Sequence, residues 1–329
     1  MQKLTILVVG GCGYIGTHMV KALLEAGHAV VTLDNLSKGN RDLLPGGEFF
    51  QGDIGDTEVL ERVFTARRFD AVMHFAAFIE VGESVQAPLN YYRNNVGATV
   101  NLLEAMVRHK VGKFIFSSSA AVYGEPETTP IDEAHPCRPT NPYGQTKLMV
   151  EKILADCDTA HGLRFMALRY FNAAGADATA AIGERHDPES HLIPLVLQVA
   201  TGQRETIAIF GSDHPTPDGT CVRDYVHVHD LAAAHLLALE ALQDGAPSAA
   251  YNLGNSNGLS VREVIETARR ITGHPIPAVE GDRRPGDPAF LVAASDKARQ
   301  ELGWDPQYET LDVIVESAWK WHQSPKAKS

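Results

Sequence analysis

A tyrosine and a lysine lie four residues apart in the segment Tyr143–Lys147, which reads YGQTK. In an α-helix this spacing places the phenol and the ammonium on the same face. A free tyrosine has a pKa of about 10 and is a poor base at neutral pH, but a neighbouring positive charge stabilises the phenolate. The pair can therefore take the proton of a substrate hydroxyl while hydride leaves the same carbon.

Three serines, Ser117, Ser118 and Ser119, end an expected strand over residues 113–118. We expect Ser119 to project past the strand end, where its hydroxyl can bind the substrate oxygen and relay the proton. The alternative, a serine that only satisfies nearby backbone groups, applies to Ser117 or Ser118. A YxxxK pattern alone is common on helices, so the catalytic interpretation depends on its combination with this serine and with the glycines described next.

A glycine-rich turn follows the first apolar run, in TILVVGGCGYIG at residues 5–16. The β-branched run predicts a strand buried on both faces, and residues 14–27 predict a helix. Gly10 permits a tight turn, Gly13 lets the backbone approach a pyrophosphate, and Gly16 lets the helix pack closely on the strand. The free amides at the start of the helix, near Tyr14 and Ile15, face the phosphates. The sequence therefore predicts a dinucleotide site.

An acidic residue, Asp34, ends the second expected strand, residues 29–33, about twenty residues after the glycines. A carboxylate there accepts a hydrogen bond from an adenosine ribose hydroxyl and repels a 2′-phosphate, which favours NAD over NADP. The alternative is a turn residue in LDNLSKGN. Asp53 follows the third strand and is expected to meet the adenine.

The first half of the chain alternates strands and helices. Expected strands at 48–51, 70–76, 113–118 and 164–170 alternate with expected helices at 57–67, 91–109 and 143–157. This order predicts an α/β fold with a doubly wound, Rossmann-like parallel sheet that binds ligands at the carboxyl ends of its strands. The sequence becomes richer in Pro, Gly and His from about residue 173. We expect a dinucleotide-binding domain at 1–172 and a smaller mixed α/β substrate lobe at 173–329, with some segments of the lobe returning to the first sheet.

Composition narrows the classes of partner. The formal net charge of −12 argues against nucleic acid or a membrane surface. The four cysteines, at positions 12, 137, 157 and 221, form no CxxC pair and have no metal-ligand spacing to histidine, so we expect reduced thiols and no metal site. The chain contains no apolar run of transmembrane length and begins a strand near Met1, so we expect a cytoplasmic protein.

Longer motifs carry a resemblance to a known family. The first half contains GGCGYIG, LDN, GDI, HFAAF, VGES, NN, SSSAAVYG, NPYGQTK and RYFNAAGA, and the second contains HLIPLVLQ, IAIFG, DGTCVRDYVHV, NLGN and RRPGDPA. Together they resemble the extended short-chain dehydrogenase/reductase family, and within it the branch that inverts carbon 4 of nucleotide sugars. The resemblance covers nearly the whole chain. It implies interconversion of UDP-glucose and UDP-galactose through a 4-keto sugar, with tightly bound NAD holding the hydride, as in galactose metabolism.

The resemblance also implies residue roles. Tyr143 would act as base and then acid, Lys147 would bind the nicotinamide ribose and lower the tyrosine pKa, and Ser119 would assist the proton transfer. The implied cofactor contacts are Gly10, Gly13, Tyr14, Ile15, Gly16, Asp34, Asn35, Asp53, Ile54, Phe75, Ala76, Ala77, Asn94, Ser117, Tyr143, Lys147 and Tyr170. The implied substrate contacts are Ser119, Tyr143, Asn172, His191, Leu192, Phe210, Arg223, Tyr225, Arg284, Asp287 and Phe290.

Within the substrate set, Arg223 and Arg284 suit the diphosphate by their fork geometry. Each has an alternative partner close in sequence, Asp224 or Asp287. The bulk of Phe290 matches a position that favours hexoses over N-acetylhexosamines in this family.

Two positions depart from the family pattern. Ile79 replaces a lysine that some members carry near the pyrophosphate, and His191 replaces an asparagine on the uridine side.

Other functions remain open at this stage. Nucleotide-sugar 4,6-dehydratases of this family carry an Asp-Glu pair where this chain has Ala120-Ala121, and alanine cannot perform that acid and base chemistry. A UDP-pentose or UDP-N-acetylhexosamine 4-epimerase shares these motifs. A non-catalytic NAD-sensing protein is the alternative from a different class. The resemblance further implies a homodimer, formed through the helices around residues 91–109 and 143–157.

Overall fold

The computed structural model describes residues 3–284 and 288–328. Its centre is a sheet of seven strands, all paired in parallel, in the order β10-β6-β5-β4-β1-β2-β3. The strands are β1 (Thr5–Val9), β2 (Ala29–Asp34), β3 (Glu48–Gln51), β4 (Ala71–His74), β5 (Lys113–Ser119), β6 (Arg164–Tyr170) and β10 (Ala249–Leu253). The strand order reverses at β1, where doubly wound sheets bind ligands beyond the carboxyl ends of the strands.

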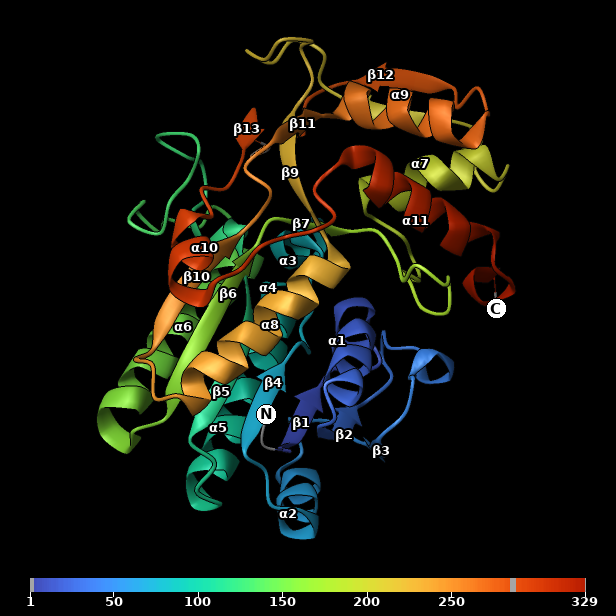
Figure 1. The fold of residues 1–329 in the computed structure, drawn as a ribbon. Helices are drawn as coiled ribbons and strands as arrows, with labels where there is room; N and C mark the ends of the chain where they lie inside the picture. Colours follow the sequence, from blue (N-terminus) through green and yellow to red (C-terminus); the bar gives the residue numbers. More distant parts are fainter. Residues whose placement is uncertain (1–2, 285–287, 329) are drawn as a thin grey trace.

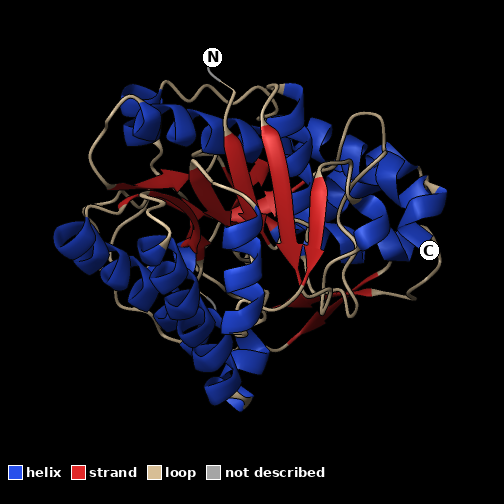
Figure 2. Ribbon diagram, turned by 90° about the horizontal axis from the view of Figure 1, so that it is seen from below, coloured by secondary structure: helices blue, strands red, loops and turns tan. Residues whose placement is uncertain are grey.

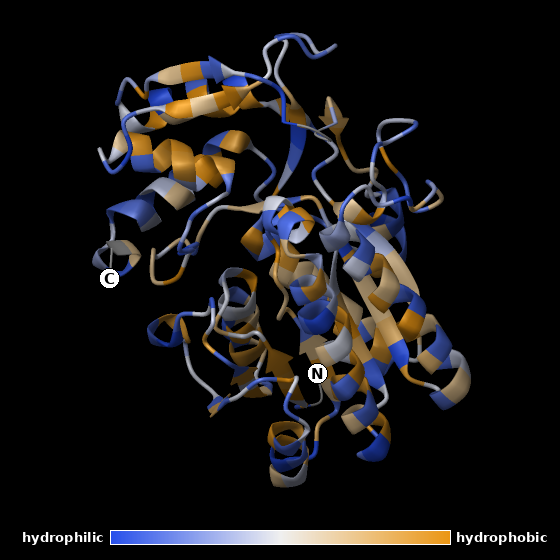
Figure 3. Ribbon diagram, turned by 180° about the vertical axis from the view of Figure 1, so that it is seen from behind, coloured by the Kyte–Doolittle hydropathy of each residue, from blue (hydrophilic) through white to orange (hydrophobic). Residues whose placement is uncertain are grey.

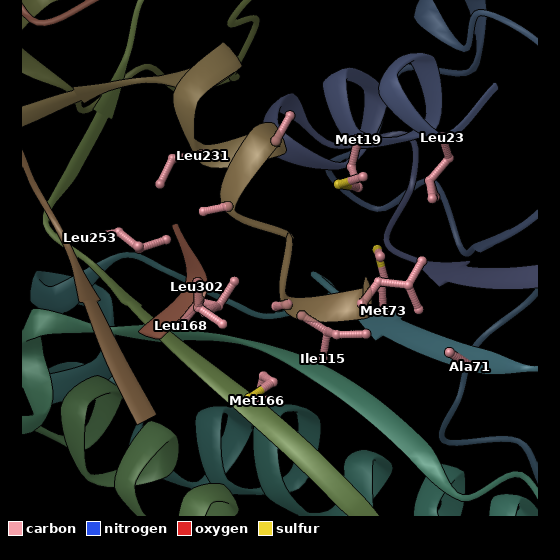
Figure 4. Packing of buried hydrophobic residues seen from close by; sticks show 14 of the residues in the cluster. Met19, Leu23, Ala71, Met73, Ile115, Met166, Leu168, Leu231, Leu253 and Leu302 are labelled. Atoms are coloured by element: carbon pink, nitrogen blue, oxygen red, sulfur yellow. The ribbon is translucent and has the colours of Figure 1, made fainter. Parts of the chain in front are cut away.

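Helices cover both faces of this sheet (Figures 1 and 2). One face packs against α1 (Tyr14–Glu25), α8 (Val228–Gln243) and α10 (Asp296–Leu302), and the other against α2 (Thr57–Ala66), α5 (Ala98–Arg108) and α6 (Pro142–His161). Figure 4 shows the first of these cores, in which Met19 of α1 lies near Met73 of β4 and Leu231 of α8 lies on the side of Leu253 of β10. Two separate hydrophobic cores therefore hold the sheet between its helical layers.

The sequence explains the ends of α6, the helix that carries the tyrosine and lysine. Asn141 caps its start by accepting a hydrogen bond from the amide of Gly144 at 2.9 Å, and Pro142 occupies the first turn, where no amide hydrogen is needed. Gly162 ends the helix with φ of 66°, a left-handed conformation that favours glycine. Along this and the other helices, apolar and polar residues are mixed (Figure 3), as expected where one face of a helix is buried and the other is exposed.

A second lobe lies over the carboxyl ends of the strands (Figure 1). In it, β9 (Val222–His227) pairs with β7 (Asn172–Ala174), β11 (Gly258–Ser260) and β13 (Phe290–Leu291), while β8 (Ile207–Phe210) pairs with β12 (Ala278–Gly281). Helices α7 (Leu192–Ala200), α9 (Val261–Thr272) and α11 (Leu311–Gln323) share its hydrophobic core. Among the described residues, no helix combines the length and apolarity needed to cross a membrane.

The predicted α/β architecture is confirmed, and three segments from beyond residue 173 complete the first sheet and its cover. They are β10, which pairs with β6, and α8 and α10, which pack on one face. The helix expected at 91–109 is three consecutive segments: α4 (Pro88–Tyr91), a π-helical turn at Tyr92–Gly97, and α5. A short helix, α3 (Val81–Gln86), precedes them. The division of the chain at residue 172 stays a prediction.

The close approach of α1 to the glycine turn gives a test of the fold. A Cβ atom at Gly16 would lie 2.2 Å from the carbonyl oxygen of Gly10, so we expect Gly16→Ala to lower the free energy of unfolding by at least about 1–3 kcal/mol. Gly97→Ala is the matched control, since an added Cβ there would meet only the Tyr92 oxygen at 3.9 Å. It should be neutral or stabilising by up to about 1 kcal/mol. Urea denaturation followed by circular dichroism measures both, and equal effects would contradict the packing argument.

Candidate active site

The glycine turn forms a cradle at the end of β1. Gly10 has φ of +79°, and a Cβ there would lie 2.5 Å from the backbone nitrogen of Ala76. At Gly13 an added Cβ would contact only the Gly10 oxygen, at 3.4 Å, and Gly13 lines the adjoining clefts. A side chain at Gly13 would thus protrude into open space that a ligand can fill. The turn fits a pyrophosphate held by backbone amides.

A narrow cleft extends from this turn over the ends of β2 and β3. Asp34, buried at its floor, accepts hydrogen bonds from the amides of Cys12 at 2.9 Å and Leu36 at 2.8 Å. Burial raises the pKa of Asp34, and the two amide bonds oppose that shift. Asn35 donates to Asp53 at 2.7 Å across the cleft mouth. The predicted adenosine contacts Asp34, Asn35, Asp53 and Ile54 line this cleft, as do Ala76 and Asn94, which are predicted to lie along the cofactor.

A second, larger cleft of about 900 Å³ separates the sheet from the second lobe. It shares Gly10, Gly13, Phe75 and Ala77 with the narrow cleft, so one continuous groove runs along the carboxyl edge of the sheet. The remaining predicted cofactor contacts line the larger cleft: Tyr14, Ile15, Gly16, Ser117, Tyr143, Lys147 and Tyr170. Every predicted cofactor contact therefore lies along this groove.

Lys147 lies buried between the end of β5 and the tyrosine one turn before it. Its ammonium donates to the carbonyl oxygen of Ser117 at 2.7 Å and lies 5.8 Å from the centre of the Tyr143 ring. Burial lowers the pKa of Lys147 to about 7, and Glu151 opposes that shift. Near neutral pH both the charged and the neutral form of Lys147 are therefore populated.

Tyr143 and Ser119 meet at the mouth of β5. Burial raises the pKa of the Tyr143 phenol above its ordinary value, and a hydrogen bond with the Ser119 side chain opposes that rise. Lys147 is not among the groups that shift the phenol pKa here, and Ser119 only opposes the rise caused by burial. The expectation that Lys147, together with an oxidised nicotinamide ring, lowers the tyrosine pKa stays a prediction.

A buried network that the sequence analysis missed fixes α6 against the sheet. Arg169 of β6 contacts both carboxylate oxygens of Glu151, at 3.0 and 2.6 Å, and its guanidinium donates to the Tyr123 hydroxyl at 2.8 Å. The Ser118 hydroxyl also donates to Glu151, at 2.5 Å. Glu151 stands one helical turn after Lys147, so a continuation of the same spacing, Tyr143, Lys147, Glu151, was the available signal.

The second lobe supplies the opposite wall of the large cleft. Asn172, His191, Leu192, Tyr225 and Arg284 line it, as the resemblance implied for the substrate. Phe210 borders it through Arg284, whose guanidinium carbon lies 3.9 Å from the centre of the Phe210 ring.

Three other predicted substrate residues are not found at the described part of this wall. Arg223 and Phe290 are not among the described lining residues, and Asp287 falls outside the described part of the chain. Arg223 donates to the carbonyls of Val222 and Pro288, each at 2.8 Å. Asp224, its suggested sequence neighbour, accepts instead from the amides of Asn255, Ser256 and Ala293.

The two positions that depart from the family pattern both border the cleft. Ile79 is 38% exposed and presents an apolar side chain to it. His191 contacts Glu184, a residue that the sequence analysis did not single out. The role of either residue toward a ligand stays a prediction.

The sequence of this chain matches a known protein family. Residues 6–254 match the model of the NAD dependent epimerase/dehydratase family. The chain belongs to this family. A UDP-glucose 4-epimerase of Halalkalibacterium halodurans is 56% identical over 320 residues, covering 97% of this chain and 96% of its own.

Two solved members of the NAD dependent epimerase/dehydratase family have the same fold. A UDP-glucose 4-epimerase from Brucella ovis in complex with NAD is 47% identical, with a TM-score of 0.94 and coverage of 96% of this chain and 98% of its own. Another from Bifidobacterium longum, in complex with NAD+ and UDP, is 40% identical, with a TM-score of 0.93 and coverage of 99% and 100%.

The lowered pKa of Lys147 predicts how stability depends on pH. The unfolded chain keeps a lysine pKa of 10.5, while the folded chain has a pKa of about 7. Between these values the unfolded state binds the proton and the folded state does not, so the contribution of Lys147 to the free energy of unfolding rises with pH and is lost as pH falls toward 7. The slope approaches ~1.4 kcal/mol per pH unit.

We therefore expect Lys147→Met to flatten the profile of unfolding free energy between pH 7 and 10 relative to the unsubstituted protein. Lys152→Met, at an exposed position of the same helix, is the control and should leave the profile unchanged. Urea titrations at half-unit pH steps measure the difference. Parallel profiles for the protein and its Lys147→Met variant would contradict the buried, partly neutral lysine.

Proposed function

We propose that this protein interconverts UDP-glucose and UDP-galactose by transient oxidation at carbon 4 of the sugar, using tightly held NAD. The observation that supports this most strongly is the meeting of Ser119, Tyr143 and Lys147 with the glycine turn in one groove, under a lobe that presents Arg284. The relatives and neighbours reported above carry this activity in their names, and the Brucella ovis structure contains NAD.

The residues of the chain suit NAD. Gly13 leaves room against the phosphate-binding turn, and Asp34 ends β2 where it can accept from a ribose hydroxyl and disfavour a 2′-phosphate. Asp34 keeps acceptor capacity beyond its two amide bonds, because a carboxylate has about four lone-pair sites. When bound, NAD supplies a hydride acceptor that can later return the hydride.

The proton steps belong to Tyr143 and Ser119. As the phenolate, Tyr143 takes the proton of the sugar 4-hydroxyl while hydride leaves carbon 4, and as the phenol it later gives the proton back when hydride returns, while the Ser119 hydroxyl bonds the same oxygen and holds it in line. Lys147, one helical turn after Tyr143, keeps the phenol oriented and binds the nicotinamide ribose.

The second lobe allows either face of the sugar to be presented for reaction. Arg284 is an exposed guanidinium at the cleft wall, suited to phosphate oxygens. Binding energy placed on the diphosphate and uridine, which do not react, lets the 4-keto sugar turn and present either face without leaving. Epimerisation needs this loose hold on the sugar.

A dehydratase reaction is disfavoured by the residues after β5. Ala120 and Ala121 line the cleft where water loss would need an acid and a base. Discrimination against N-acetylhexosamines is assigned by analogy to Phe290, which lies in β13 beside Val222.

Removal of the phenol tests the proposed chemistry. We expect Tyr143→Phe to lower the rate of UDP-galactose conversion by about 10²–10⁴-fold, since general acid–base catalysis contributes that much. The variant should still release nicotinamide cofactor on denaturation in the same amount as the unsubstituted protein. Tyr92→Phe, outside the residues that line either cleft, is the control and should retain activity.

The assay is NMR of UDP-galactose incubated with purified protein and no added NAD. Conversion that requires added NAD in proportion to product would contradict a resident cofactor. An active Tyr143→Phe variant would exclude the phenol as the proton carrier.

We further propose that the protein acts as a cytoplasmic homodimer. Val85 on α3 and Leu89 on α4 are 62% and 72% exposed, and both helices pack against α6, where Met149 is 36% exposed. A run of exposed apolar side chains over adjoining helices is typical of an interface.

Leu89→Glu should therefore convert the protein to a monomer in size-exclusion chromatography with light scattering. Val279→Glu, at an exposed apolar position on β12 in the other lobe, should leave the dimer intact. A monomeric unsubstituted protein, or a dimer that survives Leu89→Glu, would contradict this interface.

A further inference from the structure

Four side chains with metal-ligand atoms converge in the loop between β7 and α7. They are Glu184, His186, Glu189 and His191, and one ligand atom from each lies within 4.8 Å of all the others. In the sequence they form an E-x-H-x-x-E-x-H run that contains no cysteine. Nothing in the proposed epimerase chemistry uses Glu184 or Glu189.

The carboxylates of this cluster are buried. The side chains of Glu184 and Glu189 are each 5% exposed, while those of His186 and His191 are 18% and 45% exposed. Buried carboxylates need a compensating cation close by. Two carboxylates with two neutral imidazoles carry a charge of about −2, which one divalent ion neutralises.

The spacing of the ligand atoms suits a small, four-coordinate ion. The Nδ1 atom of His186 lies 3.2 Å from a Glu184 oxygen and 3.7 Å from a Glu189 oxygen, and Nδ1 of His191 lies 4.0 Å from the same Glu189 oxygen. Around Zn²⁺, with ligands at about 2.1 Å, the edge of a regular tetrahedron is about 3.4 Å. Small side-chain rotations bring four such atoms onto one ion. Calcium and magnesium are less suitable, since they prefer oxygen ligands alone.

We propose that Glu184, His186, Glu189 and His191 bind a divalent transition metal ion, with zinc as the reference ion, at a structural site beside the substrate cleft. The four protein ligands complete a tetrahedral shell, which is typical of structural rather than catalytic zinc. This ion would not take part in the hydride or proton steps.

The surroundings of the loop indicate what the ion would stabilise. The carbonyl of Glu184 accepts from the Trp321 indole at 2.7 Å, and Arg185 bonds the side chain of Asn40 at 3.0 Å and the carbonyl of Lys326 at 2.7 Å. The loop thus joins the lobe to the region after β2. Its last ligand, His191, immediately precedes α7 and lines the cleft. A metal here would fix the wall of the cleft next to Leu192.

The test is direct metal binding by the full chain. Protein stripped with a chelator and then freed of it is titrated with zinc chloride against a chromogenic zinc indicator. We expect one tight site per chain and a rise in melting temperature on zinc addition, because a ligand that binds only the folded state stabilises it. Loss of an outer-shell partner already weakens metal binding by about 10–100-fold, so His191→Asn should weaken it by at least about 100-fold and abolish the melting shift.

Two further variants keep the outcome decisive. Glu189→Gln preserves the size of the side chain and an acceptor for the amides of Ser190 and His191, and should also weaken zinc binding while remaining folded by circular dichroism. His214→Asn removes a histidine that lies 3.3 Å from the Cys221 sulfur in another part of the lobe, and should leave the affinity unchanged.

Absence of a one-to-one site in the unsubstituted protein at micromolar zinc would overturn the proposal and leave the cluster as histidinium–carboxylate pairs. Zinc binding that survives in His191→Asn and Glu189→Gln, or is lost in His214→Asn, would also overturn it by placing the ion elsewhere. Neither result bears on whether the protein epimerises UDP-sugars, because the titration measures no activity.

Discussion

The geometry of the active site depends on one buried ion pair, between Arg169 of β6 and Glu151 of α6. The pair is bidentate, and its remaining hydrogen bonds go to Ser118 and Tyr123, so both charges are satisfied away from water. Tyr123 in turn donates to Asn252 of β10 at 2.7 Å. Strands β5, β6 and β10 and helix α6 are thereby held in a single register. A buried pair adds little net stability over apolar packing, but it specifies one arrangement where its partners are fully bonded.

Burial acts on the reactive pair in opposite senses. It raises the pKa of Tyr143 and lowers the pKa of Lys147, so each shift favours the neutral form of its own group. The chain alone therefore provides a phenol that keeps its proton and an amine that is only partly charged. The positive charge that favours the phenolate has to come from the bound oxidised cofactor. The protonation of Tyr143 therefore depends on the redox state of that cofactor.

Local sequence predicted the elements that position the site. The glycines at 10, 13 and 16, the acid at the end of β2 and the YxxxK spacing each depend on short-range geometry, and their expected strands and helices are present. What escaped prediction depends on contacts between distant residues. The pairing of Glu151 with Arg169 and the four ligands between β7 and α7 give little local signal, because burial and convergence are properties of the folded chain.

The same limit applies to the electrostatics of the site. The expectation for the tyrosine pKa considered the charges of Lys147 and of the nicotinamide ring, whereas burial is the largest influence on both side chains. Arg223 and Arg284 look alike in sequence, yet of the two only Arg284 is among the described residues that line the cleft, while Arg223 donates to the carbonyls of Val222 and Pro288. Most residues that the resemblance implied line the groove, since they stand at the carboxyl ends of strands, which local sequence predicts well.

The return of β10 and α8 to the first sheet affects how the protein can be made. A growing chain that has reached only the end of β6 would expose an unpaired strand edge and leave one apolar face without α8. The nucleotide-binding half therefore cannot close until β10 and α8 have been synthesised, and its apolar face is complete only with α10, which ends at Leu302. Co-translational folding should occur late and almost at once in both lobes, and a nascent chain stalled earlier would be a natural client for chaperones.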